Sequence, residues 1–298
     1  MAAHPDPAPD PAHHPDPDSD SDAEPGETGD LFADPENYYP PSPPPTVESY
    51  TMQDGAVIAL HLVGHSSLEA HHLWNGSRVV AQHFEAHPAL VRGRTVLELG
   101  AGAGLPSIAA AVLGAARVVV TDYPDPDLVE TMWKNVRGCA LIPRTDDDEG
   151  DASLPIVVDG YVWGADAAPL LAHLLPGPDA AARDPAAGGG FDVLVLADLL
   201  FRHSEHGHML DSIDKAMARR RGSVAYVVFS SYRPWLAHKD LAFFDLARQR
   251  GFEVEKLLER KMDRPLFEDD PGDVEVRKTV LGFTLRWPRE KCLDGEES

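Results

Sequence analysis

The chain is short of cysteine, of positive charge and of long apolar runs, and each shortage excludes a class of protein. Its 298 residues include only two cysteines, Cys139 and Cys292, too few for a disulfide framework, so a reduced intracellular protein is expected. The net charge of −23 argues against binding along a nucleic-acid backbone and favours a basic partner. No run approaches the roughly 20 apolar residues that span a bilayer. The start, MAAHPDPAPDP, lacks the features of a secretory signal or a transit peptide, which leaves the cytoplasm as the expected compartment.

Positive charge is absent from the first quarter of the chain. No Lys or Arg precedes Arg78, whereas 14 of the 49 acidic residues do. Residues 1–30 have almost nothing to bury, so a disordered acidic tail with solvated histidines is expected there. The folded domain is expected over residues 31–298, beginning with a proline-rich arm. Two insertions are expected, an acidic loop at 145–153 and an Ala/Gly/Pro-rich loop at 176–190. Both are interpreted as solvated loops, with docking of a cationic substrate as the alternative for the acidic one.

Strand and helix patterns alternate through the folded part. It begins with a β-hairpin over residues 48–63, turning at Gln53-Asp54-Gly55, and a helix over residues 73–86. Strands are then expected at 95–99, 117–121, 155–163, 191–197, 223–230, 253–258 and 276–287. Helices are expected at 105–113, 126–137, 204–219 (with Ser204 as N-cap) and 236–250. This alternation predicts one α/β domain, a Rossmann-like, mostly parallel sheet of seven strands with helices on both faces.

The segment VLELGAGAGLPSIAAAVLGAARVVVTD, residues 96–122, carries the clearest chemical signal. A strand ends near Glu98, a turn containing Gly100, Ala101 and Gly102 follows, and the next strand ends at Asp122. Glycines allow a ligand to approach the backbone, and a carboxylate at the second strand end can accept both hydroxyls of a ribose. Leu105 stands where a dinucleotide fold has its third glycine. The acidic-first pattern resembles motif I of class I S-adenosylmethionine-dependent methyltransferases more than an NAD site.

The other strand ends support a nucleoside pocket. Ligands of open α/β sheets lie beyond the carboxyl ends of the strands. In addition to the glycine turn and Asp122, these ends place Trp163 and the pair Ala197-Asp198 at the same edge. Trp163 offers a face for an adenine ring, and Trp74, at a helix start in LWNGS, is a candidate cover for the cofactor.

Several segments together resemble a known family. They are LFADPENYYPPSPPPT, LWNGSRVVA, VLELGAGAGLPS, VVTDYPDPDLVETMWKNV, YVWG and LADLLFRHSEH. They are similar to the fungal nicotinamide N-methyltransferase-like proteins, now understood as N-terminal and lysine methyltransferases of translation elongation factor 1-alpha. The resemblance implies a reversed seventh strand, S-adenosylmethionine as cofactor, and elongation factor 1-alpha as the protein substrate. The enzyme is expected to be a monomer. It also implies cofactor contacts at Trp74, Gly100–Gly102, Asp122, Trp163 and Ala197, and entry of the methyl acceptor near Asp198–His203.

The acceptor side departs from the wider lysine methyltransferase group, because Asp198-Leu199-Leu200-Phe201 replaces D-x-x-Y and lacks its tyrosine. Asp198 is expected to hold the incoming ammonium, His203 to take its proton, and Phe201, Tyr232 or Trp235 to supply a cation–π wall. No metal is expected, since His203, His206 and His208 lack further ligands. Two other functions stay open here, a small-molecule N-methyltransferase of the nicotinamide type and a non-catalytic module that binds S-adenosylmethionine.

Overall fold

The computed structural model describes residues 43–144, 150–174 and 189–293. The expected acidic tail and almost all of the proline-rich arm lie outside the described residues. So do residues 145–149 of the acidic insertion and nearly all of the Ala/Gly/Pro-rich insertion. None of the helices within the described ranges is long and apolar enough to cross a membrane.

The expected β-hairpin is confirmed. Strands β1 (Thr46–Thr51) and β2 (Val57–Leu62) pair antiparallel, with Thr51 opposite Val57. Gly55 adopts a φ of +89° in the turn, and the Asp54 carboxylate accepts a hydrogen bond from the Ala56 amide at 2.9 Å. Both residues favour a tight reversal, which explains why this turn was recognisable in the sequence.

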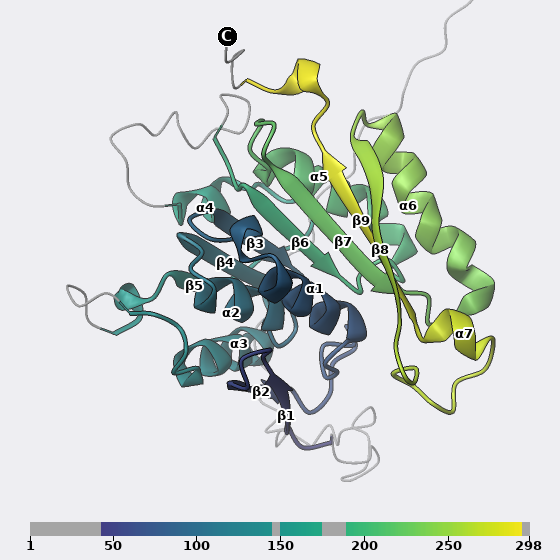
Figure 1. The fold of residues 1–298 in the computed structure, drawn as a ribbon, viewed down its shortest axis with the longest axis horizontal. Helices are drawn as coiled ribbons and strands as arrows, with labels where there is room; N and C mark the ends of the chain where they lie inside the picture. Colours follow the sequence, from purple (N-terminus) through teal and green to yellow (C-terminus); the bar gives the residue numbers. More distant parts are fainter. Residues whose placement is uncertain (1–42, 145–149, 175–188, 294–298) are drawn as a thin grey trace, which may run out of the picture. The chain divides into compact units, whose positions relative to one another are not determined.

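The central sheet has seven strands in the order β5-β4-β3-β6-β7-β9-β8 (Figure 1). Their bounds are β3 (Thr95–Leu99), β4 (Arg117–Asp122), β5 (Ile156–Gly160), β6 (Val193–Ala197), β7 (Val224–Ser230), β8 (Glu253–Lys261) and β9 (Thr279–Arg286). Strands β3 to β7 are parallel to their neighbours, whereas β9 pairs antiparallel with both β7 and β8. The last strand is therefore reversed, as the family resemblance implies. The chain order changes direction at β3, between β4 and β6, where a ligand crevice opens in such sheets.

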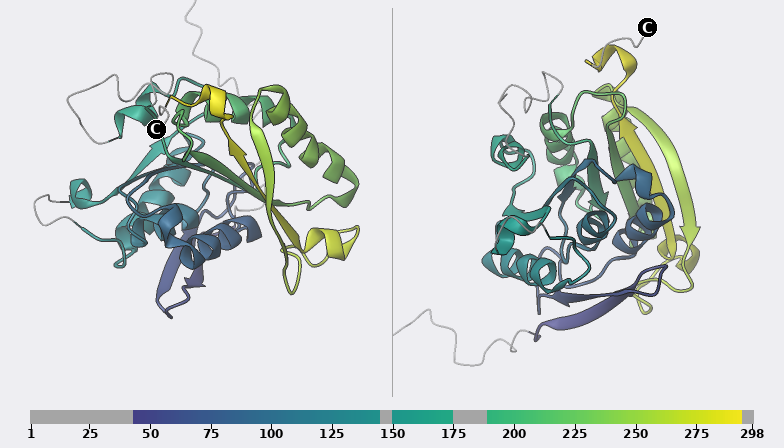
Figure 2. Two further views of the ribbon diagram at one scale, coloured as in Figure 1. Left: turned by 45° about the horizontal axis from the view of Figure 1, so that its top comes forward. Right: turned by 60° about the vertical axis from the view of Figure 1, so that its left-hand side comes forward.

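Helices cover both faces of the sheet (Figures 1 and 2). Their bounds are α1 (Asn75–Ala86), α2 (Leu105–Val112), α3 (Pro126–Gly138), α4 (Ala168–Ala172), α5 (His206–Ala216), α6 (Ala237–Gln249) and α7 (Val274–Arg277). Alternate residues of a strand point to opposite faces. Accordingly, Val96 packs in one hydrophobic core with α1, α2, α3 and the hairpin, while Leu97 packs in a second core with α4, α5 and α6.

Three local expectations are wrong. Ser204 does not cap α5, because it lies in a 3-10 turn, His203–Glu205, and its hydroxyl donates to Glu205 instead. The final strand begins at Thr279, because Asp273 caps the short helix α7 by accepting from the Glu275 amide at 2.8 Å. Strand β5 ends at Gly160, where a side chain would collide with Pro124. Trp163 therefore lies in the loop that follows the strand. Helix α4 was not expected.

Candidate active site

A pocket opens at the carboxyl ends of the parallel strands, beside the point where the strand order changes direction. Its lining draws on the β2–α1 loop, the turn after β3, the ends of β4 and β6, and the loops after β5 and β6. Ten of the side chains and turn residues that the sequence singled out meet there: Trp74, Glu98, Gly100, Ala101, Gly102, Asp122, Trp163, Ala197, Asp198 and Phe201. The pocket therefore collects both the expected cofactor side and the expected acceptor side.

The turn after β3 brings backbone against the pocket. Gly100 has a φ of +62°, and a Cβ there would lie 2.7 Å from Leu199 Cδ2 and 2.9 Å from Trp163 Cζ2. Glu98 is fully buried beneath this turn, where its Oε2 accepts from the Ser107 amide in the first turn of α2, at 2.9 Å. Burial raises the pKa of Glu98 to about 8, although the hydrogen bonding with Ser107 opposes the rise. The geometry thus gives Glu98 a role in holding the turn on the helix.

Asp122 at the end of β4 also supports the glycine turn. Its Oδ2 accepts from the Gly102 amide and its Oδ1 accepts from the Tyr123 amide, each at 2.7 Å. Burial raises the pKa of this carboxyl, and the two amide hydrogen bonds oppose the shift. Each carboxylate oxygen has a further lone pair, so the group can accept hydroxyl hydrogens from a ligand while remaining fixed to the turn.

An aromatic wall, formed by Trp74, Phe201 and Tyr232, stands on the expected acceptor side. The ring of Trp74, at the N-cap of α1, lies nearly parallel to that of Phe201, with centroids 5.6 Å apart and 16° between planes. Tyr232 meets Trp74 edge-on at 4.7 Å. The indole Nε1 donates to the backbone carbonyl of Glu69 at 2.9 Å, which fixes the ring's orientation.

Asp198 follows β6 and is held more firmly than the sequence indicated. Its Oδ1 accepts from the Ser230 amide at 2.8 Å and from the Tyr232 hydroxyl at 3.2 Å, and its Oδ2 accepts from the Gly76 amide. Its φ of +54° is unusual for a residue with a side chain. Burial raises its pKa to about 7 against the opposing hydrogen bonds. A Cβ on Gly76 would collide with this carboxylate and with the Val228 carbonyl, which explains the glycine in LWNGS.

The remaining predicted residues lie elsewhere. His203 is not among the residues lining the pocket, and its Nε2 is 2.7 Å from Oδ1 of Asp240. His206 contacts the Leu200 carbonyl, while His208 contacts Glu205, so these three histidines have separate partners. Tyr232 stands behind Trp74, and Trp235 is exposed.

Several lining residues were not anticipated from the sequence. They are polar or aromatic and follow strands or precede α1: Glu69, His72, Tyr123, Tyr161, Arg202 and Glu205. Tyr123 follows Asp122 directly and Arg202 follows Phe201, so their proximity to predicted residues was the available signal. No comparable signal marked Glu69 or His72, whose positions depend on the course of the β2–α1 loop.

The residues present fit S-adenosylmethionine. A glycine turn of positive φ faces the pocket, a carboxylate with free lone pairs stands at the next strand end, and Trp163 supplies an aromatic surface beside Gly100. These are the groups that accommodate an amino-acid chain, a ribose and an adenine ring. Asp198, Trp74 and Phe201 line the same pocket beside these groups.

Proteins that resemble this chain in sequence are also methyltransferases. A family model described as lysine methyltransferase matches residues 57–145. The chain is 61% identical over 264 residues to the protein N-terminal and lysine N-methyltransferase efm7 of Neurospora crassa, covering 89% of this chain and 90% of that protein. It is 55% identical to the protein of that name from Gibberella zeae, covering 89% and 96%, and 40% identical to that of Schizosaccharomyces pombe, covering 87% and 95%.

Solved structures similar to this chain include TYW2 of P. horikoshii in complex with MeSAdo, at 16% identity and a TM-score of 0.46, covering 82% of this chain and 72% of that one. Another is a T. thermophilus 16S rRNA methyltransferase in complex with AdoMet and guanosine, at 17% identity and a TM-score of 0.42, covering 84% and 52%. By its extensive identity to the fungal proteins, the chain belongs to the family of protein N-terminal and lysine N-methyltransferases, enzymes whose methyl donor is S-adenosylmethionine.

Proposed function

We propose that this enzyme methylates the N-terminal α-amine and the adjacent lysine of translation elongation factor 1-alpha in the cytoplasm. The observation that carries the proposal is that one pocket holds the glycine turn and Asp122 at one side and Asp198, Trp74 and Phe201 at the other. The identity of the substrate rests on the resemblance of the motifs, and the fungal relatives' names agree with methylation of an N-terminus and of lysine. The chain's net charge of −23 favours a basic peptide.

We assign the cofactor to one half of the pocket. Asp122 would accept the ribose hydroxyls, Trp163 and Ala197 would border the adenine, and the Gly100–Gly102 turn and Trp74 would hold the methionine end, since all of them line the pocket. Glu98 supports this half by holding Ser107 and the start of α2. When bound, S-adenosylmethionine supplies an electrophilic methyl group on a sulfonium. The protein's task is to align an amine with it and to exclude water.

Asp198 and the aromatic wall receive the amine. An ammonium group approaching Trp74 and Phe201 meets ring faces, which attract a cation. The Asp198 carboxyl, whose pKa burial raises to about 7, provides a negative charge at the same place in its ionised form, with Tyr232 bonded to it. Tyr232, which follows β7, donates its hydroxyl to this carboxylate, whereas Phe201 occupies the tyrosine position of the D-x-x-Y pattern. An α-amine with a reference pKa of about 8 is partly neutral at pH 7, whereas lysine at about 10.4 must lose its proton.

His203 is a positioning residue in this scheme. It lies off the pocket, and its partner Asp240 also accepts from the Ser231 hydroxyl at 2.7 Å. Ser231 adjoins Ser230 and Tyr232, both of which bond Asp198. The His203–Asp240 pair therefore supports the segment that orients the catalytic carboxylate.

The test is transfer of labelled methyl from S-adenosylmethionine to purified unmethylated elongation factor 1-alpha, with nicotinamide as the competing acceptor and peptide mapping of the product. Label on the N-terminal peptide of the factor alone is expected. Label on another protein peptide would overturn the proposed site, and label on nicotinamide alone would overturn the proposed substrate class. Asp122→Ala is the matched control, because it is expected to lose cofactor binding, measured by calorimetry, and activity together.

A further inference from the structure

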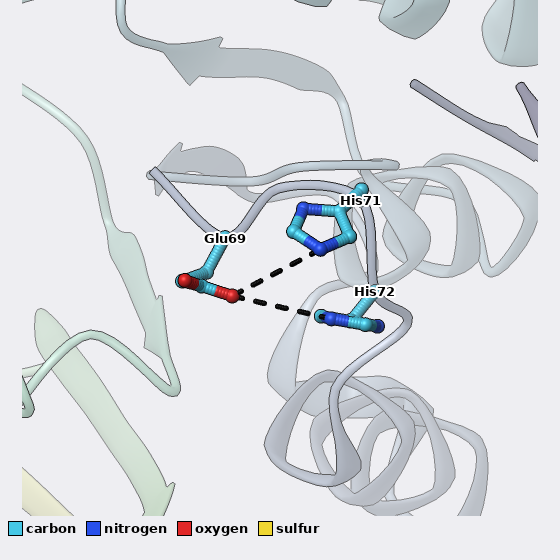
Figure 3. Close-up of side chains that lie close together, drawn as sticks. All are labelled: Glu69, His71 and His72. Carbon is cyan, nitrogen blue, oxygen red and sulfur yellow. Dashed lines mark ion pairs between the residues drawn. The ribbon is translucent and has the colours of Figure 1, made fainter. Parts of the chain in front are cut away.

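A second group of chemically active side chains lies beside the pocket, on the loop between β2 and α1. Figure 3 shows the imidazoles of His71 and His72 on one side of the Glu69 carboxylate. Oε2 of Glu69 lies 4.0 Å from Nε2 of His71 and 4.0 Å from Nε2 of His72. Three ligand atoms, one from each residue, all lie within 4.8 Å of one another. We refer to Glu69, His71 and His72 as the rim cluster.

The spacing of the rim cluster is close to that of a metal site. Zinc binds imidazole nitrogen and carboxylate oxygen at about 2.1 Å, which places the ligands of a tetrahedral ion about 3.4 Å apart. The two 4.0 Å separations from Glu69 must therefore shorten by about half an ångström, and the separation of the two imidazole ligand atoms, which is within 4.8 Å, by at most about 1.4 Å, for the three atoms to surround one ion. The side chains are 45%, 22% and 32% exposed, so an ion can enter and water can occupy its remaining position.

The backbone and rings around the cluster are already held in place. The Glu69 carbonyl accepts from the Trp74 indole at 2.9 Å, and the Glu69 amide donates to the Ser66 carbonyl at 3.0 Å. The His72 ring meets Phe267 edge-on, with centroids 4.9 Å apart. These contacts limit the conformational freedom that ion binding would otherwise remove.

We propose that the rim cluster binds a divalent transition-metal ion of the zinc type and that the bound ion lowers the rate of methyl transfer. Two imidazoles and one carboxylate favour zinc-like ions over Mg²⁺ or Ca²⁺, which prefer oxygen ligands. Glu69 and His72 also line the active-site pocket, so an ion between them changes the charge and the space at its rim. This site is distinct from the histidines at 203, 206 and 208, and the sequence did not indicate it.

The first experiment measures Zn²⁺ binding to the full chain by calorimetry and Co²⁺ binding by visible absorption, with His71→Ala and Glu69→Gln as variants. Each variant is expected to weaken the site by about tenfold or more, since even outer-shell changes cost 10–100-fold. His87→Ala is the matched control, because it disrupts another histidine pair, with His83 at 4.8 Å between ring centroids, and leaves the cluster intact. Equal Zn²⁺ affinity in wild type and both variants would overturn the site and leave the cluster as a set of carboxylate–imidazole ion pairs.

The second experiment tests the effect on turnover. His71 does not line the pocket, so His71→Ala is expected to keep its rate in the presence of a chelator. Wild type and His87→Ala are expected to lose activity as Zn²⁺ is added, whereas His71→Ala resists it at the same concentrations. Inhibition of all three proteins at one Zn²⁺ concentration would overturn the regulatory role, even if calorimetry supported binding.

Discussion

The Asp198 carboxylate receives three donors, from Gly76, Ser230 and Tyr232, and lines the pocket on the side that we propose for the acceptor. Asparagine offers one oxygen and an NH₂ group in its place, so at least one buried amide loses its acceptor. We expect Asp198→Asn to lower kcat by about 100-fold or more, and to lower the free energy of unfolding by about 1–3 kcal/mol. Steady-state kinetics and urea unfolding measure the two effects.

Tyr232→Phe is the matched control for that change. It removes one donor and leaves the carboxylate and its two amide partners in place. The loss of stability is expected to be about 1 kcal/mol, that of a single hydrogen bond. Wild-type kcat in Asp198→Asn, with the enzyme folded and binding S-adenosylmethionine, would show that this carboxylate only holds the backbone.

Titration of Glu98 is expected to make the free energy of unfolding depend on pH. Burial raises its pKa from 4.5 to about 8, so the folded state prefers the neutral acid. The stability it contributes is fully present below the unfolded pKa, near 4.5, and is lost as pH rises through 8. Glu98→Gln does not titrate. Between pH 5 and pH 9, wild type should therefore lose stability relative to Glu98→Gln, by an amount on the order of a few kcal/mol.

Urea unfolding of both proteins at the two pH values measures this difference, and titration of all other groups cancels in the subtraction. A stability difference that is the same at pH 5 and pH 9 would mean that Glu98 is ionised in the folded enzyme throughout. Its hydrogen bond from Ser107 would then outweigh the cost of burial.

Asn135 on α3 connects three elements that build the cofactor side. Its Oδ1 accepts from the His61 amide of β2 at 2.7 Å, and its Nδ2 donates to the carbonyls of His61 at 2.9 Å and of Ala103 at 3.0 Å. The hairpin, α3 and the glycine turn thus share one buried side chain. We expect Asn135→Ala to lower the free energy of unfolding by about 2–4 kcal/mol and to weaken S-adenosylmethionine binding.

Thermal unfolding and calorimetry with the cofactor check this expectation. Lys134→Ala, the exposed neighbour on the same helix, is the control and should change neither quantity. If Asn135→Ala lost stability while binding the cofactor with wild-type affinity, the glycine turn would be held by its own bonds to Thr121 and Asp122.

The sequence could predict those structural elements that are specified by residues close together in the chain. The hairpin turn, the alternation of strands and helices, and the glycine turn before Asp122 each depend on a few adjacent residues, and the structure has them where expected. Ser204 was wrongly placed because a 3-10 turn precedes α5, and nothing nearby marks where that turn ends. The partners of Asp198 could not be predicted, because they are distant in the sequence: Gly76 precedes Asp198 by 122 positions and Ser230 follows it by 32. The rim cluster depends likewise on the path of a loop.

Charge distinguishes the protein substrate from the cofactor when the molecule is taken as a whole. The net charge of −23 produces a field that attracts a basic peptide from a distance, whereas the site proposed for S-adenosylmethionine is a pocket in which buried groups such as Glu98 and Asp122 stand beside half-buried ones. Salt screens long-range attraction and affects contacts inside a pocket much less.

Raising the ionic strength from about 0.05 to about 0.5 M is therefore expected to lower kcat/KM for the protein substrate by about tenfold. The KM for S-adenosylmethionine should change by less than about twofold. Initial rates with each substrate varied in turn measure both values, and a kcat/KM for the protein substrate that is independent of salt would mean that docking relies on short-range contacts around the pocket instead.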